Sequence, residues 1–448
     1  MEAIKQFFRQ FTRTTPFVLA NIMIVVPYLL FIHLLDFSSS ISALPFVLFY
    51  TFRMTGIFLI RGLHRAIDQY TLLMVALLLG GVGSFLTLAG AVHTNFYLLG
   101  STFLGLSASW LTPANTSVTY LEREKGYQTM TTSQYLIALI VLLPLFLALT
   151  LAVPVQTILV PIILGFYYIC AYHTVKHYPH YELDFKELTK NVFSVPELMW
   201  FLLFFVALFL LRSGRAFVDE TLLSTGIFLF AGIFILALLV IHRQKDHWKV
   251  PLWQNALTFL NGMFGNFIFL FGTFYVAVFK GISAQATLLF LPYLLGVIAS
   301  LLFAGRLRKQ FSNPLVVQLV GLAAGLVLLS LPQLFPIAIF VLTFFQNGTS
   351  SWLSRLYYQT TEIEKKQRIT AKFSTSNKGS ITHQFLLMIF MLIALPLQEL
   401  PAKDLLLLNT LHNSAVFAMM NEVKFTSIVL LLLGLLVVGR MGKNAFGD

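Results

Sequence analysis

The residues best suited to binding chemistry lie in one polar stretch, Gly105–Tyr120, with the sequence GLSASWLTPANTSVTY. Read as a helix, it places small and hydroxyl residues on one face, spaced four, three, four and three apart: Gly105, Ser109, Thr112, Thr116 and Thr119. Because the flanking sequence is apolar, this face is expected to avoid lipid and to turn toward a cavity or another helix. Hydroxyls beside an indole (Trp110) suit a neutral or aromatic ligand, although close helix packing would leave the same pattern.

A second stretch near residue 350, QNGTSSWLSRLYY, partly repeats this pattern. Aligning Trp352 with Trp110 puts four polar residues at the positions of the first stripe: Asn347, Ser351, Ser354 and Tyr358. Two such helices far apart in one chain are typical of a duplicated membrane protein with a central site between its halves. We therefore expect Trp110 and Trp352 to face each other across that site.

The candidate substrate-binding residues are neutral amides and hydroxyls together with the two indoles: Trp110, Thr112, Asn115, Asn261, Asn266, Gln346, Asn347, Ser351 and Trp352. Such an amphipathic pocket suits bulky apolar or cationic compounds, or a lipid, better than a sugar or a small anion. Hydrogen bonding between helices is the competing interpretation for each residue. No catalytic residue, cofactor or metal is expected, because Cys170 is the only cysteine and the ten histidines lack metal-ligand spacing.

Arginines near the ends of apolar runs form a second set of candidates, with a gating or latching role: Arg53, Arg61, Arg65, Arg306, Arg308 and Arg355. Another group, Arg212 and Arg215 with Asp219 and Glu220, is expected to form an exposed charged turn, with a gate as the alternative. No carboxylate is placed securely at mid-span. His383, near the inner end of the run 379–398, is of a residue type that titrates near neutrality, and a hydrogen-bonded helix histidine is the competing interpretation. A coupling proton therefore stays open as a partner.

The amino-acid composition indicates that these residues belong to an integral membrane protein. The chain has 448 residues, of which 58% are hydrophobic and 11% charged, against about 25% charged in a soluble protein. Its +12 formal charge does not predict nucleic-acid binding, because the Lys and Arg residues stand singly between apolar runs. In the first sixteen residues, apolar and basic residues separate onto two helical faces, which predicts a short helix on the inner membrane surface.

Fourteen apolar runs approach the roughly 20 residues that a spanning helix needs. They are approximately 16–35, 42–60, 71–93, 95–120, 129–152, 155–174, 196–212, 221–242, 254–279, 282–304, 314–331, 335–358, 379–398 and 424–440. With the N-terminus inside, alternate loops hold 23 of the 30 Lys and Arg residues. This positive-inside asymmetry predicts a multi-pass protein of the cell membrane with both termini in the cytoplasm. The charged segment 359–378 is expected to be a solvated connector, and Lys424 is expected outside.

Loop motifs in both halves resemble the major facilitator superfamily. The span 2–3 connection carries Gly56, Arg61, Gly62 and Arg65, and the second half carries Gly281, Leu291, Pro292, Gly296 and Ala304-Gly305-Arg306-Leu307-Arg308. Two extra spans between two sets of six, followed by Pro251-Leu252, resemble the fourteen-span branch that includes bacterial multidrug exporters. The resemblance implies an all-α fold of two six-helix bundles plus two inserted helices. The domains would be 1–174, 175–253 with linker and inserted helices, and 254–448.

The leading hypothesis is therefore a secondary transporter, not an enzyme, that exports hydrophobic or amphipathic small molecules by alternating access. Ile60 replaces the acidic residue of the family's span 2–3 loop, and the glycine- and proline-rich antiporter motif is missing from span 5. Both departures favour the alternative, a flippase for a lipid or lipid-linked precursor. A membrane-embedded transferase using His177, His180 and Asp184 is a weaker alternative. Membrane lipids, a small amphipathic substrate and a periplasmic adaptor protein are the further candidate partners.

Overall fold

The computed structural model describes residues 2–34, 40–63, 67–126, 130, 132–178, 195–217, 219–243, 250–281, 284–401 and 414–446. These residues are helical apart from short connections, and no strand occurs among them. The chain divides into two compact units, Met1–Gly226 and Ile227–Asp448, called the N-terminal and C-terminal units below. The three-part division expected from the sequence stays a prediction.

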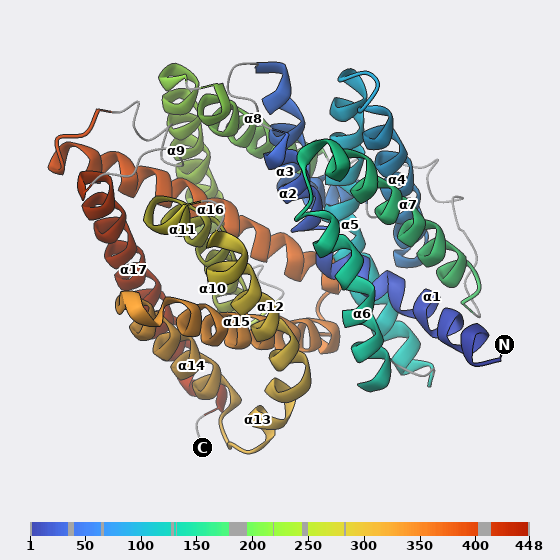
Figure 1. Ribbon diagram of the computed structural model, residues 1–448. Helices are drawn as coiled ribbons and strands as arrows, with labels where there is room; N and C mark the ends of the chain where they lie inside the picture. Colours follow the sequence, from blue (N-terminus) through green and yellow to red (C-terminus); the bar gives the residue numbers. More distant parts are fainter. Residues whose placement is uncertain are drawn as a thin grey trace. The chain divides into compact units, whose positions relative to one another are not determined.

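The N-terminal unit is built from helices α1 to α8 and the start of α9 (Figure 1). Their bounds are α1 Glu2–Ile22, α2 Val26–His33, α3 Ser40–Leu63, α4 Gln69–Ala89, α5 Asn95–Glu124, α6 Thr132–Ala148, α7 Val153–Lys176, α8 Val195–Phe217 and α9 Glu220–Arg243. Asp68 starts α4 by accepting hydrogen bonds from the backbone of Tyr70 and Thr71, as an N-cap residue does.

The C-terminal unit contains the rest of α9 and the helices that follow. They are α10 Leu252–Asn266, α11 Gly272–Lys280, α12 Leu291–Ala299, α13 Gly305–Lys309, α14 Pro314–Ser330, α15 Phe335–Gln359, α16 Arg368–Leu397 and α17 Ser414–Phe446. Three π-helical segments join some of them, namely η3 Phe267–Phe271, η5 Ala286–Phe290 and η6 Ser300–Ala304. Gly281 ends α11 with φ of 86°, a backbone conformation that favours glycine.

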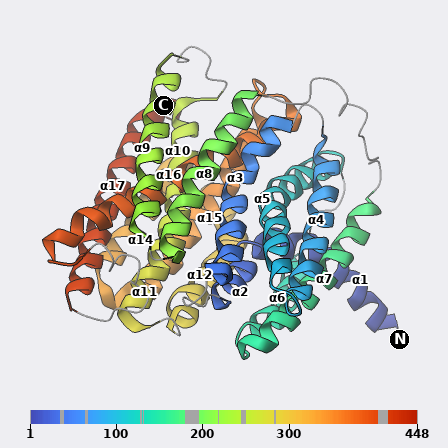
Figure 2. The ribbon, with the colours of Figure 1, turned by 90° about the horizontal axis from the view of Figure 1, so that it is seen from above.

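The two units repeat one pattern of helix pairing. In the N-terminal unit α5 packs on α1, α3 and α4, and α7 packs on α1, α4 and α6. In the C-terminal unit α15 packs on α10, α12 and α14, and α17 packs on α10, α14 and α16. The remaining pair, α1 with α6, corresponds to α10 with α16. Figure 2 shows α4, α5 and α7 side by side. This correspondence is what an internal duplication produces.

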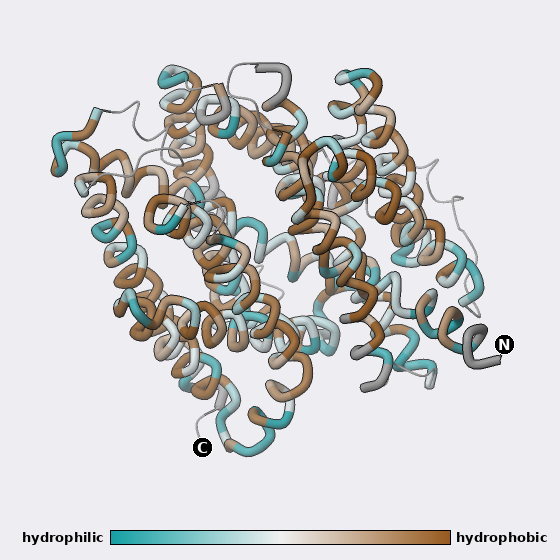
Figure 3. The backbone as a smooth tube through the Cα atoms, in the orientation of Figure 1, coloured by the Kyte–Doolittle hydropathy of each residue, from teal (hydrophilic) through white to brown (hydrophobic). Residues whose placement is uncertain are grey.

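Many of the helices have the length and composition of membrane spans. Eight spans among the described residues pass a length and hydropathy test, and a ninth results if the bent pair of α1 and α2 is one span. Shorter apolar helices occur at Leu198–Gly214, Glu220–Leu236 and Pro314–Ser330. Apolar residues cover most of the helix lengths, and many helix ends are polar (Figure 3). The chain is therefore a multi-pass membrane protein, and the number fourteen stays a prediction.

Three expected elements differ from the observed ones. The run 16–35 is not one straight helix, because α1 and α2 meet at a bend of 57°. Pro27 lies in the first turn of α2, where a proline is tolerated, whereas inside a continuous helix it would remove a backbone hydrogen bond. The final helix starts at Ser414 rather than near 424. The expected connector 359–378 already enters α16 at Arg368.

Three basic residues expected near water are buried instead. Arg212 is 4% exposed and lies over the ring of Tyr50, so it does not belong to an exposed charged turn. Lys372 and Lys424 are each 1% exposed, although the sequence places them in a solvated connector and outside the membrane. A hydropathy pattern predicts that a charged residue lies at or beyond the end of a membrane helix. In the structure, the helices that carry these three residues continue past them and pack against neighbouring helices.

Glycines allow α10 and α16 to cross at backbone contact. A Cβ added to Gly262 would collide with the carbonyl oxygen of Ser376, and one added to Gly379 would collide with that of Phe259. Small residues that let helix backbones approach closely are typical of membrane helix interfaces. The crossing fixes the register of α10 against α16, which carry the polar residues described next.

Candidate functional site

Helices α10, α15 and α16 bring several of the predicted binding residues together in the C-terminal unit. The side chain of Gln346 on α15 points toward α10, where its Nε2 lies 3.5 Å from the carbonyl oxygen of Asn261 and contacts the position of Gly265. Asn266 lies at the end of α10 and meets α16. Asn261, Asn266 and Gln346 therefore belong to one polar region, called the amide cluster below.

Asn261 is the most unusual member of the amide cluster. Its residue is 1% exposed, and neither Nδ2 nor Oδ1 has a hydrogen-bond partner. A buried amide that makes no hydrogen bond costs about 1–3 kcal/mol. This side chain therefore presents an unused donor and an unused acceptor inside an apolar helix bundle.

His383 on α16 completes the cluster. Its Nδ1 lies 3.0 Å from Oδ1 of Asn266, and the ring packs edge-on against Phe267 at 5.5 Å. With Nδ1–H donating to the amide oxygen, the neutral ring presents the lone pair of Nε2, which has no partner. The π-helical segment η3 starts directly after Asn266, and such segments often occur at functional sites.

A buried lysine lies on the same helix as His383. The Nζ of Lys372 donates to Oγ of Ser350 on α15 at 2.6 Å and lies 4.1 Å from the ring centroid of Phe373. Within the described part of the chain, no carboxylate pairs with this ammonium group. The sequence analysis missed Lys372 because its neighbours are polar. Small and hydroxyl residues around Lys372 indicate that this part of the helix packs against another helix. They include Thr370, Ser374 and Gly379.

The first polar stripe packs against other helices of the N-terminal unit. Trp110 is buried, and its Nε1 donates to the carbonyl oxygen of Gly56 on α3 at 2.9 Å. Thr112 donates to the carbonyl oxygen of Ala20 on α1 at 2.7 Å. Thr116 and Thr119 donate to carbonyls of their own helix, and Asn115 is half-buried. These contacts agree with the packing interpretation of the stripe.

The residues of the second stripe differ in how far they are exposed. Trp352 is buried and lies 6.0 Å from Trp253 of α10, ring centroid to ring centroid. Asn347 is half-buried and Ser351 is exposed. The structure thus gives each indole neighbours within its own unit, and the facing of Trp110 and Trp352 stays a prediction.

The candidate latch residues have separate positions. Arg308 donates from Nη1 to the carbonyl oxygen of Gly348 at 2.8 Å, which ties α13 to α15. Arg53 is half-buried, with its guanidinium 5.6 Å from the ring of Tyr50, whereas Arg306 and Arg355 are exposed. Arg65 and the side chain of Arg61 lie outside the described residues.

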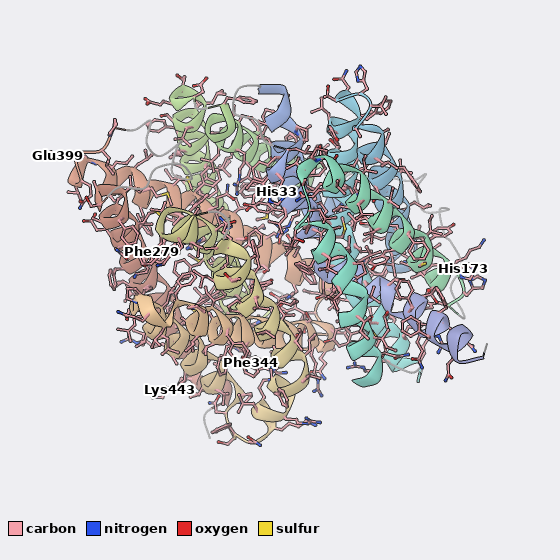
Figure 4. The ribbon with its side chains drawn as sticks, in the orientation of Figure 1. His33, His173, Phe279, Phe344, Glu399 and Lys443 are labelled. Carbon is pink, nitrogen blue, oxygen red and sulfur yellow. The ribbon has the colours of Figure 1, made fainter. Side chains whose placement is uncertain are left out.

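A further polar group between α11 and α17 was also missed by the sequence analysis. The hydroxyl of Tyr275 lies 3.3 Å from Oδ1 of Asn421 and 3.5 Å from Nζ of Lys424. Nearby, Phe279 of α11 (labelled in Figure 4) packs on Phe417 at 4.4 Å. Among the described residues, no group of three or more His, Cys, Asp or Glu could hold a metal ion.

No family model matches the chain, and no curated protein matches it. Solved structures do match the chain. An auto-inhibited POT family peptide transporter superposes with a TM-score of 0.55 at 14% identity, covering 98% of this chain and 96% of that one. The POT family transporter PepTSo gives 0.51 at 11% identity, covering 99% and 98%. The E. coli fucose:proton symporter FucP gives 0.47 at 11% identity, covering 96% and 98%.

The chain therefore has the fold of these peptide transporters over nearly its whole length. The all-α fold expected for a multi-pass membrane protein is confirmed, and membership of the major facilitator superfamily stays a prediction. The two structures named first are described as transporters, and this similarity concerns the fold alone.

Proposed function

We propose that the chain is a secondary transporter that exports hydrophobic or amphipathic small molecules across the cell membrane by alternating access. The fold supports the general class, because the solved structures that match it end to end are transporters. The repeated helix pairing supports it as well, since alternating access in such folds moves one repeat against the other around a site.

The proposed topology has fourteen spans, two six-helix bundles, and both termini in the cytoplasm. Two features of the described helices support it. If the helices separated by a bend or a π-helical segment are joined, α1–α7 provide six segments and α10–α17 provide six more. The remaining helices, α8 and α9, are the proposed inserted pair, so the domains remain 1–174, 175–253 and 254–448.

The observation that carries the functional proposal is the unpartnered amide of Asn261. A purely structural buried amide is normally satisfied by its neighbours, whereas a binding group can take its hydrogen bonds from a ligand. Asn261 lies beside Gln346 and on the same helix as Asn266, with aromatic rings of α10 close by. Neutral amides among rings suit a ligand that is apolar over most of its surface.

The other proposed binding residues are Trp110, Thr112, Asn115, Asn347, Ser351 and Trp352. Arg53, Arg61, Arg65, Arg306, Arg308 and Arg355 are the proposed gate or latch. A proton is the proposed coupling ion, because His383 and Lys372 are buried groups whose protonation can change near the amide cluster. Membrane lipids and a periplasmic adaptor protein remain proposed partners.

The test is transport by the purified chain in proteoliposomes with an imposed proton gradient. The probes are ethidium, an amphipathic cation, a radiolabelled dipeptide, and a fluorescent phosphatidylethanolamine. We expect gradient-dependent movement of ethidium, and we expect Asn261→Leu to lower its rate at least tenfold. Because leucine has the same branched shape and number of heavy atoms and removes an unsatisfied buried amide, the variant should be at least as thermally stable as the parent protein.

The matched control is Gln310→Leu, which makes the same chemical change at an exposed position. It should transport ethidium at the parental rate. Movement of the dipeptide alone, or of the lipid alone, would replace the proposed substrate class. Full transport by a folded Asn261→Leu variant would contradict the role of the amide cluster.

A further inference from the structure

A buried guanidinium in the N-terminal unit has two nitrogens without a hydrogen-bond partner. Arg212, near the end of α8, is 4% exposed. Its guanidinium carbon lies 3.7 Å from the ring centroid of Tyr50 and 6.0 Å from that of Phe46, both on α3. The nitrogens Nε and Nη2 make no hydrogen bond. The charge is thus supported by aromatic rings alone on this side.

The aromatic support is itself a packed cluster. The ring of Tyr28 on α2 lies 5.3 Å from Phe46 and 6.3 Å from Tyr50. Arg53 lies 5.6 Å from the ring of Tyr50, so this tyrosine has two guanidinium groups near it. A cation–π contact offsets only part of the free energy that is lost when a cation is removed from water.

The two unpartnered nitrogens have a specific geometry. Nε–H and the adjacent Nη2–H project from one edge of the planar guanidinium and lie parallel. This edge matches the two oxygens of a carboxylate or a phosphate, which accept both hydrogen bonds at once. Thr51 follows Tyr50 in sequence, and Ser213 follows Arg212. The hydroxyls of Thr51 and Ser213 are also buried and without hydrogen-bond partners.

Asp219, which follows α8, makes hydrogen bonds to the start of α9. The carboxylate of Asp219 accepts hydrogen bonds from the backbone nitrogens of Thr221 at 2.8 Å and Leu222 at 3.1 Å, and so caps α9. It therefore does not serve the open edge of Arg212.

We propose that the Nε/Nη2 edge of Arg212 binds an oxyanion, a carboxylate or phosphate group, in a site between α3 and α8. The anion supplies the two hydrogen bonds that Nε and Nη2 lack, and a negative charge that no carboxylate among the described residues is seen to provide. The oxyanion belongs either to a lipid headgroup or to a small soluble molecule. The site makes α8, one of the proposed inserted pair, a binding element. It does not depend on the proposed transport activity.

The experiment measures binding to the purified full chain in a neutral detergent. The probes are phosphatidylglycerol against phosphatidylcholine for the lipid source, and inorganic phosphate or acetate against chloride at equal ionic strength for the soluble source. Thermal unfolding and native mass spectrometry report binding. We expect one anionic probe to raise the melting temperature of the parent protein and Arg212→Gln to bind it at least tenfold more weakly.

Arg440→Gln is the matched control, because it removes an exposed arginine from α17, and it should bind the probe like the parent. Tyr50→Leu removes the stacked ring and should weaken binding, whereas Tyr50→Phe should keep most of it. A lipid-only response assigns the site to a headgroup, and a response to phosphate or acetate assigns it to a soluble anion. If no probe stabilises the parent protein beyond its control, the proposal is overturned without any variant. Equal binding by folded Arg212→Gln also overturns it.

Discussion

Trp110 illustrates how one side chain can satisfy two interpretations of a sequence pattern. Its position beside small and hydroxyl residues suggests a ligand-facing indole, and its surroundings show a buried ring with its Nε1 donating to Gly56. Both features follow from the same chemistry, because an indole needs one hydrogen-bond acceptor whether that acceptor is a ligand or a neighbouring helix. A stability measurement separates the two.

We expect Trp110→Ala to lower the free energy of unfolding by about 3–5 kcal/mol, because it empties a large buried volume. Trp110→Phe should cost less, since it fills most of that space and loses one hydrogen bond worth about 1 kcal/mol. Unfolding in detergent, followed by heat or denaturant, checks this. Trp200→Ala is the control, because Trp200 is half-buried, and its loss should be smaller. A Trp110→Ala variant of parental stability with weakened ethidium binding would support the ligand-facing interpretation instead.

The positions of the buried neutral polar residues were predicted from the sequence better than those of the buried charged residues. Asn261, Asn266 and Gln346 were selected as amides in apolar runs, and they come together on neighbouring helices. Arg212, Lys372 and Lys424 were assigned to helix ends because hydropathy treats a charge as a boundary. Their burial depends on a ring of α3, a hydroxyl of α15 and a phenol of α11, which are distant in sequence. Such pairings cannot be read from a local window.

At the scale of helices, composition determines where a helix runs, and close contacts determine how it bends. Most expected runs contain a helix, since about 20 apolar residues in lipid have few alternatives to helical structure. The bend between α1 and α2 and the three π-helical segments were not expected. A π-helical turn adds one residue without a compositional signature, so the sequence pattern does not show it.

The crossing of α10 and α16 gives a prediction at this scale. Gly379→Val should prevent the crossing, because the added carbons meet the backbone of Phe259, which has no alternative rotamer. Overpacking usually costs about 1–3 kcal/mol, and a backbone collision belongs at or above the upper end. Yield of folded protein and its melting temperature are the measurements. Gly305→Ala is the control, since its added Cβ has no heavy atom within 4 Å, and it should be neutral or stabilising. A Gly379→Val protein as stable as the parent would contradict the contact.

At the scale of the whole chain, an all-α membrane fold was predictable from sequence because its signals are spread over hundreds of residues. Apolar runs, alternating loop charge and a duplicated polar stripe each tolerate local errors. The helix pairing shared by the two units agrees with duplication. The substrate and direction of the proposed transport are less predictable from sequence, since they depend on a few side chains. The topology, by contrast, can be tested from the chain's only cysteine.

Cys170 is buried, so its replacement by alanine gives a cysteine-free background with little change at the surface. In that background, Val92→Cys should react with a membrane-impermeant maleimide in intact cells. Val92 is 91% exposed in the connection between α4 and α5, which the positive-inside pattern assigns to the outside. Gln367→Cys, in the basic segment before α16, should react only after the membrane is permeabilised. Labelling of both positions with denatured protein controls for intrinsic reactivity. Reaction of Gln367→Cys together with protection of Val92→Cys in intact cells would invert the proposed orientation and place both termini outside. Either result alone would contradict the proposed number of spans between the two positions.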